Sequence, residues 1–324
     1  MPTALRTLLT VLAFAALMVA AVEAGLHRVA PMPRRDLEVD DGVADLAAGD
    51  PEILVLGSSH AGAFLPLRER LGADRVVVVT EEGGTCSAFT WVYQHRLEPL
   101  LADKKRLRRV LLITTYWDTC PAWHTTYRLS LPARAWMLPD YLADVAANGI
   151  TDENHNFPFA AFKRLLGPSM LLHDRGLANL RGRLRGEQDP DSLEGRKRAR
   201  IVQRNTEIDA EAGYCETPDE LGKLDALVDV FRARGLDVTI VAFPLLDETL
   251  TETGRQSALL PYARHLAELA ARTGVRIVDH TTAAPMVYDD FEIDCDHLTV
   301  PAREKYIDWA LANGLGFLKG EAAP

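Results

Sequence analysis

The sequence predicts an α/β fold in which a mostly parallel, five-stranded sheet lies between two layers of helices. Two observations lead to this prediction. Five short apolar runs, rich in β-branched residues, alternate along the chain with segments whose apolar residues recur at helical spacing. Each run is almost continuously apolar, which is typical of strands that helices cover on both faces. Such sheets bind ligands at the carboxyl ends of their strands, and polar residues follow several of these runs.

The chain begins with an apolar segment that predicts export. Arg6 is followed by the uncharged residues 7–22 (TLLTVLAFAALMVAAV). This run fits the apolar core of a signal peptide, and it is only slightly shorter than the ~20 residues that span a bilayer. We therefore expect residues 1–26 to be a cleaved signal peptide or a retained membrane anchor, and the protein to be extracytoplasmic in either case. Residues 27–50, where prolines precede a run of acids, predict a linker to a domain at 51–318.

The first predicted strand and the turn after it contain a candidate nucleophile. Residues 53–56 (ILVL) predict a buried strand, and residues 61–71 predict a helix. A tight turn between a strand and a helix lifts a side chain clear of the sheet, next to the backbone N–H groups of the helix start. Ser59 stands in this turn, and we predict that it is the nucleophile. The alternative is that Ser58 and Ser59 only cap the helix, because serine is a preferred N-cap residue.

The remaining elements continue the alternation of strands and helices. The further predicted strands are 75–80, 109–115, 237–243 and 275–278, and the predicted helices are about 87–102, 221–234, 258–273 and 301–315. Between the third strand and the fourth, residues from about 121 to 215 show no clean strand pattern. We expect a helical insertion there, because a connection of this length usually carries helices of its own. Its basic part, residues 181–204, mixes acids with bases and predicts solvated helices.

The loop before the last predicted helix supplies a candidate base. Asp294 precedes His297 by three residues, so its carboxylate can bond to the imidazole and fix its tautomer while the other ring nitrogen faces a serine. The alternatives are a helix-start histidine with capping acids, or a metal site made of Asp294, Asp296 and His297. We expect no metal and no cofactor, because no second cluster of ligand residues follows a predicted strand.

Composition and net charge limit the kinds of partner that the protein can have. The chain is 48% hydrophobic and 25% charged, as a globular protein with a sizeable core would be. Its formal net charge is −10, whereas a general nucleic-acid-binding protein presents a basic face. We therefore expect no nucleic acid partner.

Two motifs resemble blocks I and V of the SGNH, or GDSL-type, hydrolase superfamily. They are Gly57-Ser58-Ser59-His60 and Asp294-x-x-His297-Leu298-Thr299, which stand in the family's order and enclose residues 53 to about 315. The resemblance implies a flavodoxin-like three-layer αβα sandwich with sheet order 2-1-3-4-5. It also implies a serine hydrolase in which Ser59 is the nucleophile, His297 the base and Asp294 its orienting acid. The oxyanion hole would use the backbone N–H groups of Ser59 and Gly84, with Gly83 as the alternative to Gly84.

The chain departs from the family pattern at two places. Ser58 replaces the acid that normally precedes the nucleophile. Residues 115–118 (TYWD) stand where the family has Gly-x-Asn-Asp, so the asparagine that donates to the oxyanion is absent. Losing one such donor can cost ~100–1000-fold in rate. The indole N–H of Trp117 is a candidate replacement; otherwise we expect His60, Trp117 and Asp118 to line the substrate site, or Trp117 to pack in the core.

A Gly-Ser-Ser form after an apolar N-terminus is similar to an exported branch of this family, which includes alginate O-acetyltransferases and the D-alanyl transfer protein of teichoic acid synthesis. This resemblance implies a serine esterase or O-acyltransferase that acts on a small acyl group of a cell-surface glycan. The substrate would be an acylated glycan or a small ester, and a membrane-bound acyltransferase would be a partner. The alternative is an SGNH-like domain of weak or no activity that binds a surface polymer or a membrane partner, as the missing asparagine favours.

Four cysteines are compatible with two disulfides in an exported chain. In the sheet order that the resemblance implies, Cys86 and Cys120 follow neighbouring strands, and Cys295 lies within the Asp-x-x-His loop. We hypothesise that Cys86 pairs with Cys120 and Cys215 with Cys295, which would brace the loops around the site. Free buried thiols are the alternative.

Overall fold

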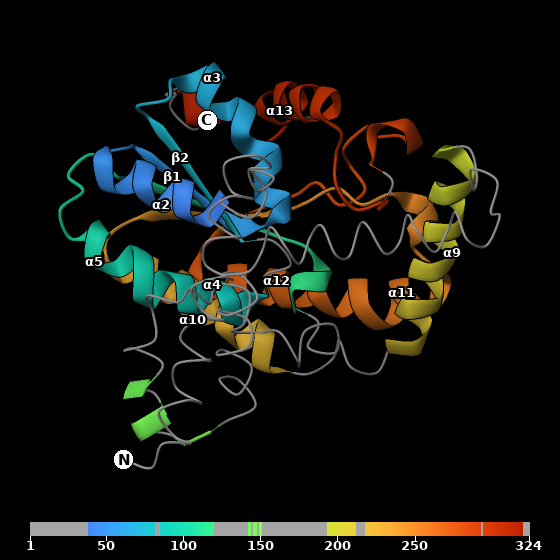
Figure 1. The fold of residues 1–324 in the computed structure, drawn as a ribbon, viewed down its shortest axis with the longest axis horizontal. Coiled ribbons are helices and arrows are strands. Elements are labelled where there is room, and N and C mark those ends of the chain that lie inside the picture. The colour runs from blue at the N-terminus through green and yellow to red at the C-terminus, as the bar shows by residue number, and fades with distance from the viewer. Residues whose placement is uncertain are drawn as a thin grey trace, which may run out of the picture.

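The computed structural model describes residues 38–81, 85–119, 142–143, 145–147, 149–150, 193–211, 218–292 and 294–319. Within these residues, five strands form one parallel sheet in the order β2-β1-β3-β4-β5 (Figure 1). The strands are β1 (Ile53–Ser58), β2 (Val76–Glu81), β3 (Arg109–Thr114), β4 (Asp237–Ala242) and β5 (Arg276–Asp279). The predicted strands and their predicted order are therefore confirmed.

Helices cover both faces of the sheet, which makes the molecule a three-layer αβα sandwich (Figure 1). The α-helices are α2 (Glu38–Ala48), α3 (Leu65–Leu71), α4 (Cys86–Val92), α5 (Glu98–Leu101), α9 (Leu193–Glu211), α10 (Pro218–Ala233), α11 (Glu252–Gly254), α12 (Leu260–Thr273) and α13 (Val300–Ala312). Alternate residues of β1 point to opposite faces. Leu54 and Leu56 belong to the core that β1 shares with α2, α4, α10 and α12, whereas Ile53 and Val55 belong to the core shared with α3 and α13.

The predicted linker is wrong for residues 38–48, which form α2. Val39 and Leu46 of this helix are buried in the core. Gly42 lets the helix approach β2 closely, because a Cβ atom at this position would overlap the carbonyl oxygen of Val78. Of the acids that suggested a solvated linker, Asp41 is exposed on the outer side of this short helix. The described fold thus begins before residue 51.

Two predicted helices have a more varied geometry than expected. The segment after β1 starts as the 3-10 helix η2 (Ser59–Phe64) and becomes α-helical only at α3, whose first turn contains Pro66. The segment after β2 is α4, then a π-helical turn, η3 (Tyr93–Leu97), and then α5, with a proline in its first turn. Proline lacks an N–H group, so it fits the first turn of a helix and marks where a new one starts.

The insertion between β3 and β4 is described only in part. Its helix α9 packs against α11 and against the short 3-10 helix η7 (Asp247–Thr249), at one end of the sheet (Figure 1). Among the residues that the structure describes, no helix is both long enough and apolar enough to cross a membrane. The predicted signal peptide or anchor, residues 1–26, lies outside them.

The predicted disulfides are wrong for the two cysteines that the structure describes. Neither Cys86 nor Cys295 is in a disulfide, and both are buried. Cys86 lies in the core beneath α4, and the Cys295 thiol lies 3.5 Å from the carbonyl oxygen of Lys197. Burial raises the pKa of each thiol, which makes both unreactive in the folded protein. Cys120 and Cys215 lie outside the described residues.

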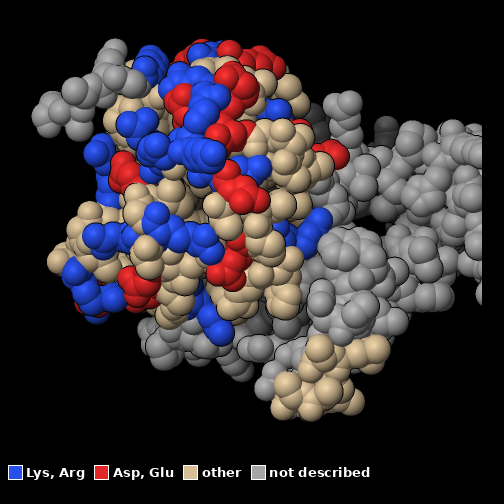
Figure 2. Space-filling view, turned by 90° about the vertical axis from the view of Figure 1, so that its left-hand side faces the viewer, with Lys and Arg blue, Asp and Glu red and all other residues tan. Residues whose placement is uncertain are grey.

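Charged side chains on the surface are intermixed by sign. Figure 2 shows basic and acidic side chains side by side on one face of the molecule. Several such pairs are within bonding distance, among them Glu52 with Arg75 (2.8 Å) and with Arg106 (2.8 Å). Exposed ion pairs of this kind each contribute little to stability, about 0–1 kcal/mol.

Candidate active site

The end of β1 positions Ser59. Gly57 pairs with Ile113 of β3, and a Cβ atom on Gly57 would lie 2.5 Å from the Ile113 carbonyl oxygen, so only glycine fits there. Ser58 ends the strand, and Ser59 is the first residue of η2. Ser58 stands at the N-cap position but makes no capping hydrogen bond with its side chain. The interpretation of Ser58 as a helix cap is therefore wrong, and its hydroxyl is used elsewhere.

The structure brings Ser59, His297 and Asp294 together in one hydrogen-bonded chain. His297 Nε2 lies 2.6 Å from Ser59 Oγ, and His297 Nδ1 lies 2.7 Å from Asp294 Oδ2. Because a carboxylate only accepts, Nδ1 carries the proton, and Nε2 is left to accept the proton of the serine hydroxyl. All three residues are partly exposed, as a site that meets a substrate requires. The arrangement can generate a serine nucleophile.

Asp294 is held as a carboxylate. Its other oxygen, Oδ1, accepts the backbone N–H groups of Asp296 and His297, each at 3.1 Å. Burial acts to raise the pKa of Asp294, but the hydrogen bond and charge of His297 outweigh it, and the pKa is about 2. A negative charge therefore faces His297 at every pH above this value, and it stabilises the imidazolium that forms when the base takes a proton.

The loop that carries the acid and the base is closed by backbone contacts. Phe291 and Leu298 form an antiparallel bridge, and the N–H of Glu292 donates to the carbonyl of His297 at 2.7 Å. Within the loop, Cys295 has a φ of 60°, a left-handed conformation that is uncommon for a residue other than glycine. The side chains on either side of Cys295 consequently bind different histidines, Asp294 binding His297 and Asp296 facing His60.

A second set of buried polar residues lies directly behind the triad. Ser58 Oγ lies 2.8 Å from His60 Nδ1 and donates to Asp118 Oδ2 at 3.3 Å. The same oxygen of Asp118 accepts the N–H of Thr115 at 2.8 Å. Burial raises the pKa of Asp118 to about 7, and it outweighs the opposing effects of the His60 charge and of the hydrogen bonds from Thr115 and Ser58. His60 Nε2 lies 3.2 Å from Asp296 Oδ1.

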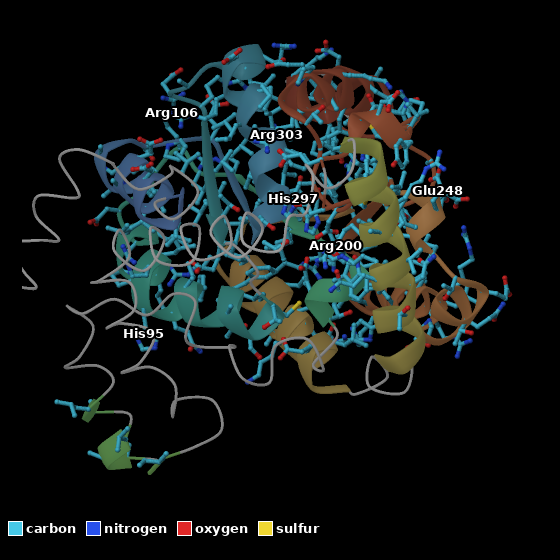
Figure 3. The ribbon with its side chains drawn as sticks, turned by 45° about the vertical axis from the view of Figure 1, so that its right-hand side comes forward. His95, Arg106, Arg200, Glu248, His297 and Arg303 are labelled. Carbon is cyan, nitrogen blue, oxygen red and sulfur yellow. The ribbon has the colours of Figure 1, made fainter. Side chains whose placement is uncertain are left out.

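Helix α9 contacts the site from the side of the insertion. Figure 3 shows His297 at the edge of the sheet, next to α9 and its Arg200. Arg204 of the same helix donates to Asp296 Oδ2 at 3.3 Å, and its guanidinium lies 5.2 Å from the centre of the Trp117 ring. Lys197 donates to the carbonyl oxygens of Tyr288 and Phe291, just before the catalytic loop. The expectation of solvated helices is thus wrong for Lys197 and Arg204, which are buried, whereas Val202 of the same helix is exposed.

The residues predicted to line the substrate site are mostly inside the protein. His60 and Asp118 are each 4% exposed, and Trp117 is 8% exposed. Trp117 packs against Tyr116, with 4.5 Å between ring centres, and the guanidinium of Arg204 lies over the Trp117 ring. A platform for a sugar needs an open ring face, so these three residues support the site from behind. Gly83 and Gly84, predicted for the oxyanion hole, lie outside the described residues.

One group of three candidate metal ligands occurs in the described part of the chain. His60, Asp296 and His297 each offer one atom, and these atoms lie within 4.8 Å of one another. This set differs from the alternative of Asp294, Asp296 and His297 raised by the sequence. The protein already supplies partners for it, because Arg204 bonds Asp296 and Ser59 bonds His297. A guanidinium next to the carboxylate makes the position unfavourable for a second cation.

Comparison with known proteins gives only distant structural likeness. No family model matches the sequence, and no curated protein matches it. Among solved structures, a candidate platelet activating factor from Streptococcus pneumonia is 12% identical, with a TM-score of 0.42 over 94% of this chain and 99% of that one. A candidate acylhydrolase from Bacteroides fragilis covers 86% of this chain and 95% of its own, with 10% identity and a TM-score of 0.41. A GDSL-like lipase from Bacteroides thetaiotaomicron covers 86% and 98%, also with 10% identity and a TM-score of 0.41. These scores are too low to carry an argument about activity, which rests on the geometry of the site.

Proposed function

We propose that the protein is a serine esterase or O-acyltransferase of SGNH type, with Ser59 as nucleophile, His297 as base and Asp294 as orienting acid. The observation that carries this proposal is the unbroken chain from Asp294 through His297 to Ser59, with contacts of 2.7 Å and 2.6 Å. Its support is that three residues from two ends of the chain meet at the carboxyl end of β1, where doubly wound sheets bind their ligands. The superfamily assignment is part of the proposal.

The geometry suggests the following sequence of proton and bond changes. As Ser59 Oγ attacks the carbonyl carbon of an ester, its proton passes to His297 Nε2, and Asp294 stabilises the resulting imidazolium. The tetrahedral intermediate collapses when the C–O bond to the alcohol breaks and His297 gives its proton to the leaving oxygen. Water or a sugar hydroxyl then attacks the acyl-enzyme with His297 again as base, and Ser59 is regenerated.

The finer parts of the proposal concern substrate and place. We propose that the acyl group is small, that the donor or acceptor is a cell-surface glycan, and that the protein acts outside the cytoplasm, anchored by residues 1–26 or released from them. A membrane-bound acyltransferase is the proposed partner. The support comes from the apolar run at residues 7–22 and from the resemblance of the Gly57–His60 motif. Release of acetate from an acetylated uronic-acid polymer by the purified protein would support this substrate class.

The experiment for the activity compares two histidines that both bond an aspartate. His265 pairs with Asp225 at 2.7 Å, as His297 pairs with Asp294, but of these two histidines His297 alone has a serine contact among the described residues. We expect p-nitrophenyl acetate hydrolysis to fall at least ~1000-fold in His297→Ala and to stay within about twofold in His265→Ala. An equal loss in both variants, or no measurable hydrolysis by the wild type, would contradict the proposal.

A second candidate function is a polymer-binding domain of weak or no activity. The observation that favours it is the sequence of residues 115–118, which offers no asparagine to an oxyanion, while Trp117 is buried against Tyr116. In this case the folded wild-type protein would fail to hydrolyse activated esters and would still bind a surface glycan. Ester hydrolysis by the wild type that is lost in Ser59→Ala supports the esterase, whereas glycan binding by a folded wild type that hydrolyses no ester supports the binding domain.

A further inference from the structure

A buried polar chain runs beside Ser59, His297 and Asp294, crosses the loop that carries His297 and Asp294, and ends on α9. It begins at Asp118, passes through Ser58 to His60, and continues from His60 to Asp296 and from Asp296 to Arg204. This chain resembles a second serine, histidine and aspartate set, but Ser58 is only 2% exposed and cannot meet a substrate. The role of this polar chain must therefore lie in the residues that it positions.

The donors in this chain can be assigned from its acceptors. Ser58 has one hydroxyl proton, which it donates to Asp118, so its oxygen accepts from His60 Nδ1–H. His60 Nε2 is then the atom that faces Asp296. Burial would raise the pKa of Asp296, but the charges of His60 and Arg204 outweigh it and hold that pKa well below its usual range. Asp296 is thus a carboxylate held between β1–η2 on one side and α9 on the other.

The ring of His60 also packs directly on the catalytic base. The rings of His60 and His297 are stacked, with 5.1 Å between centres and 10° between planes. Phe243, which follows β4, contacts His60 at 4.8 Å between ring centres. Since His60 is 4% exposed, its ring is fixed by the core, and it forms a rigid surface against which the His297 ring lies.

We propose that His60 and Asp296 are positioning residues for His297. His60 would set the plane of the catalytic imidazole by stacking, and Asp296 would fix the loop through its ion pair with His60 and its hydrogen bond from Arg204. The left-handed Cys295 makes both possible, because it directs Asp294 and Asp296 to different histidines. This inference rests on the proposed esterase function, since it concerns how the base of that reaction is held. A misplacement of about 1 Å can cost on the order of 100-fold in rate.

The test uses polar substitutions of Asp296 and His60. Asp296→Asn removes the charge that faces His60 and Arg204. His60→Gln places an amide nitrogen near the former Nε2 and keeps a donor for Asp296, whereas His60→Asn keeps only a donor near the former Nδ1, toward Ser58. We expect kcat for p-nitrophenyl acetate to fall ~10–100-fold in Asp296→Asn and His60→Asn, with KM within about twofold. His60→Gln should lose less than His60→Asn.

Two further measurements separate positioning from general damage. The double variant His60→Asn/Asp296→Asn should lose little more than either single variant, because both changes break the same contact. In the proton NMR spectrum of the wild type, the His297 Nδ1–H that bonds Asp294 should give a low-field signal, which the variants weaken while their thermal unfolding remains cooperative. The NMR signal can be measured without catalysis. An inactive wild type would therefore refute the esterase function and leave the positioning role to be decided by this signal. Unchanged kcat together with an unchanged signal in Asp296→Asn and His60→Asn would overturn the positioning role.

Discussion

Ser59 is partly exposed while its neighbours on either side, Ser58 and His60, are buried, and this difference separates their roles. The exposed hydroxyl faces the base, at 2.6 Å from His297. The buried hydroxyl of Ser58 serves Asp118 and His60 instead. The junction between β1 and η2 thus places one serine hydroxyl against His297 and the other in the buried polar chain.

Asp118 gives a prediction about stability and pH. Its pKa in the folded protein is raised by burial to about 7, against an ordinary value of 3.8. Between these two values the folded protein keeps a proton that the unfolded chain has lost, so stability falls as the pH rises through this range. Asp118→Asn removes this contribution and keeps an acceptor for the Thr115 N–H. We expect urea denaturation to show a smaller loss of stability from pH 5 to pH 8 in the variant than in the wild type.

Comparing the pH dependence of stability in the wild type and in Asp118→Asn also controls for the other titratable groups. His280, whose pKa burial lowers, also makes the stability depend on pH, but it contributes equally to both proteins. If the wild type and Asp118→Asn lost the same stability between pH 5 and pH 8, Asp118 would not carry the raised pKa that its burial implies.

At the scale of single residues, the sequence identified the triad but not its support. Ser59, Asp294 and His297 could be named because each stands in a short motif next to a predicted element. The contact of Asp296 with His60 depends on the left-handed backbone at Cys295, which no sequence motif around this residue predicts. Arg204 is 92 positions from Asp296 in the sequence, and only the docking of α9 brings them together.

The elements themselves show where glycine is needed for packing. Gly42 faces β2, where an added methyl group would overlap the Val78 carbonyl, whereas a Cβ atom on Gly222 of α10 would meet nothing within 4 Å. We expect Gly42→Ala to lower the free energy of unfolding by about 1–3 kcal/mol, since backbone must move. The matched change Gly222→Ala should raise it by about 0.5–1 kcal/mol, because alanine favours the helix.

Chemical denaturation of the two alanine variants measures both effects under the same conditions. Destabilisation in Gly222→Ala as large as in Gly42→Ala would mean that the close approach of α2 to β2 is not what requires glycine. The existence of α2 was not predicted, because its few buried residues, Val39 and Leu46, are outnumbered by the acids around them. The strands were predicted because their apolar runs are short, continuous and bounded by turns.

At the scale of the whole molecule, the topology decides which residues can meet. The parallel order β2-β1-β3-β4-β5 puts the ends of β1, β3 and β4 at one edge, from which Ser59, Asp118 and Phe243 follow. The insertion returns to the same edge through α9, which ties the site to a segment that the sequence pattern placed in solvent. Periodicity could predict the sheet, but it could not predict this docking, because the buried side chains that the structure describes in α9 are those of a lysine and an arginine.

The most direct test of the proposed activity is to map the site of covalent labelling by a fluorophosphonate on the folded protein. We predict one adduct, on Ser59, that forms in the wild type and in His265→Ala. It should be absent from Ser59→Ala and should form at least ~100-fold more slowly in His297→Ala, because the hydroxyl then lacks its base. Peptide mass spectrometry after digestion identifies the modified residue. An adduct on another residue, or a folded wild-type protein that stays unlabelled, would contradict the assignment of Ser59 as an activated nucleophile.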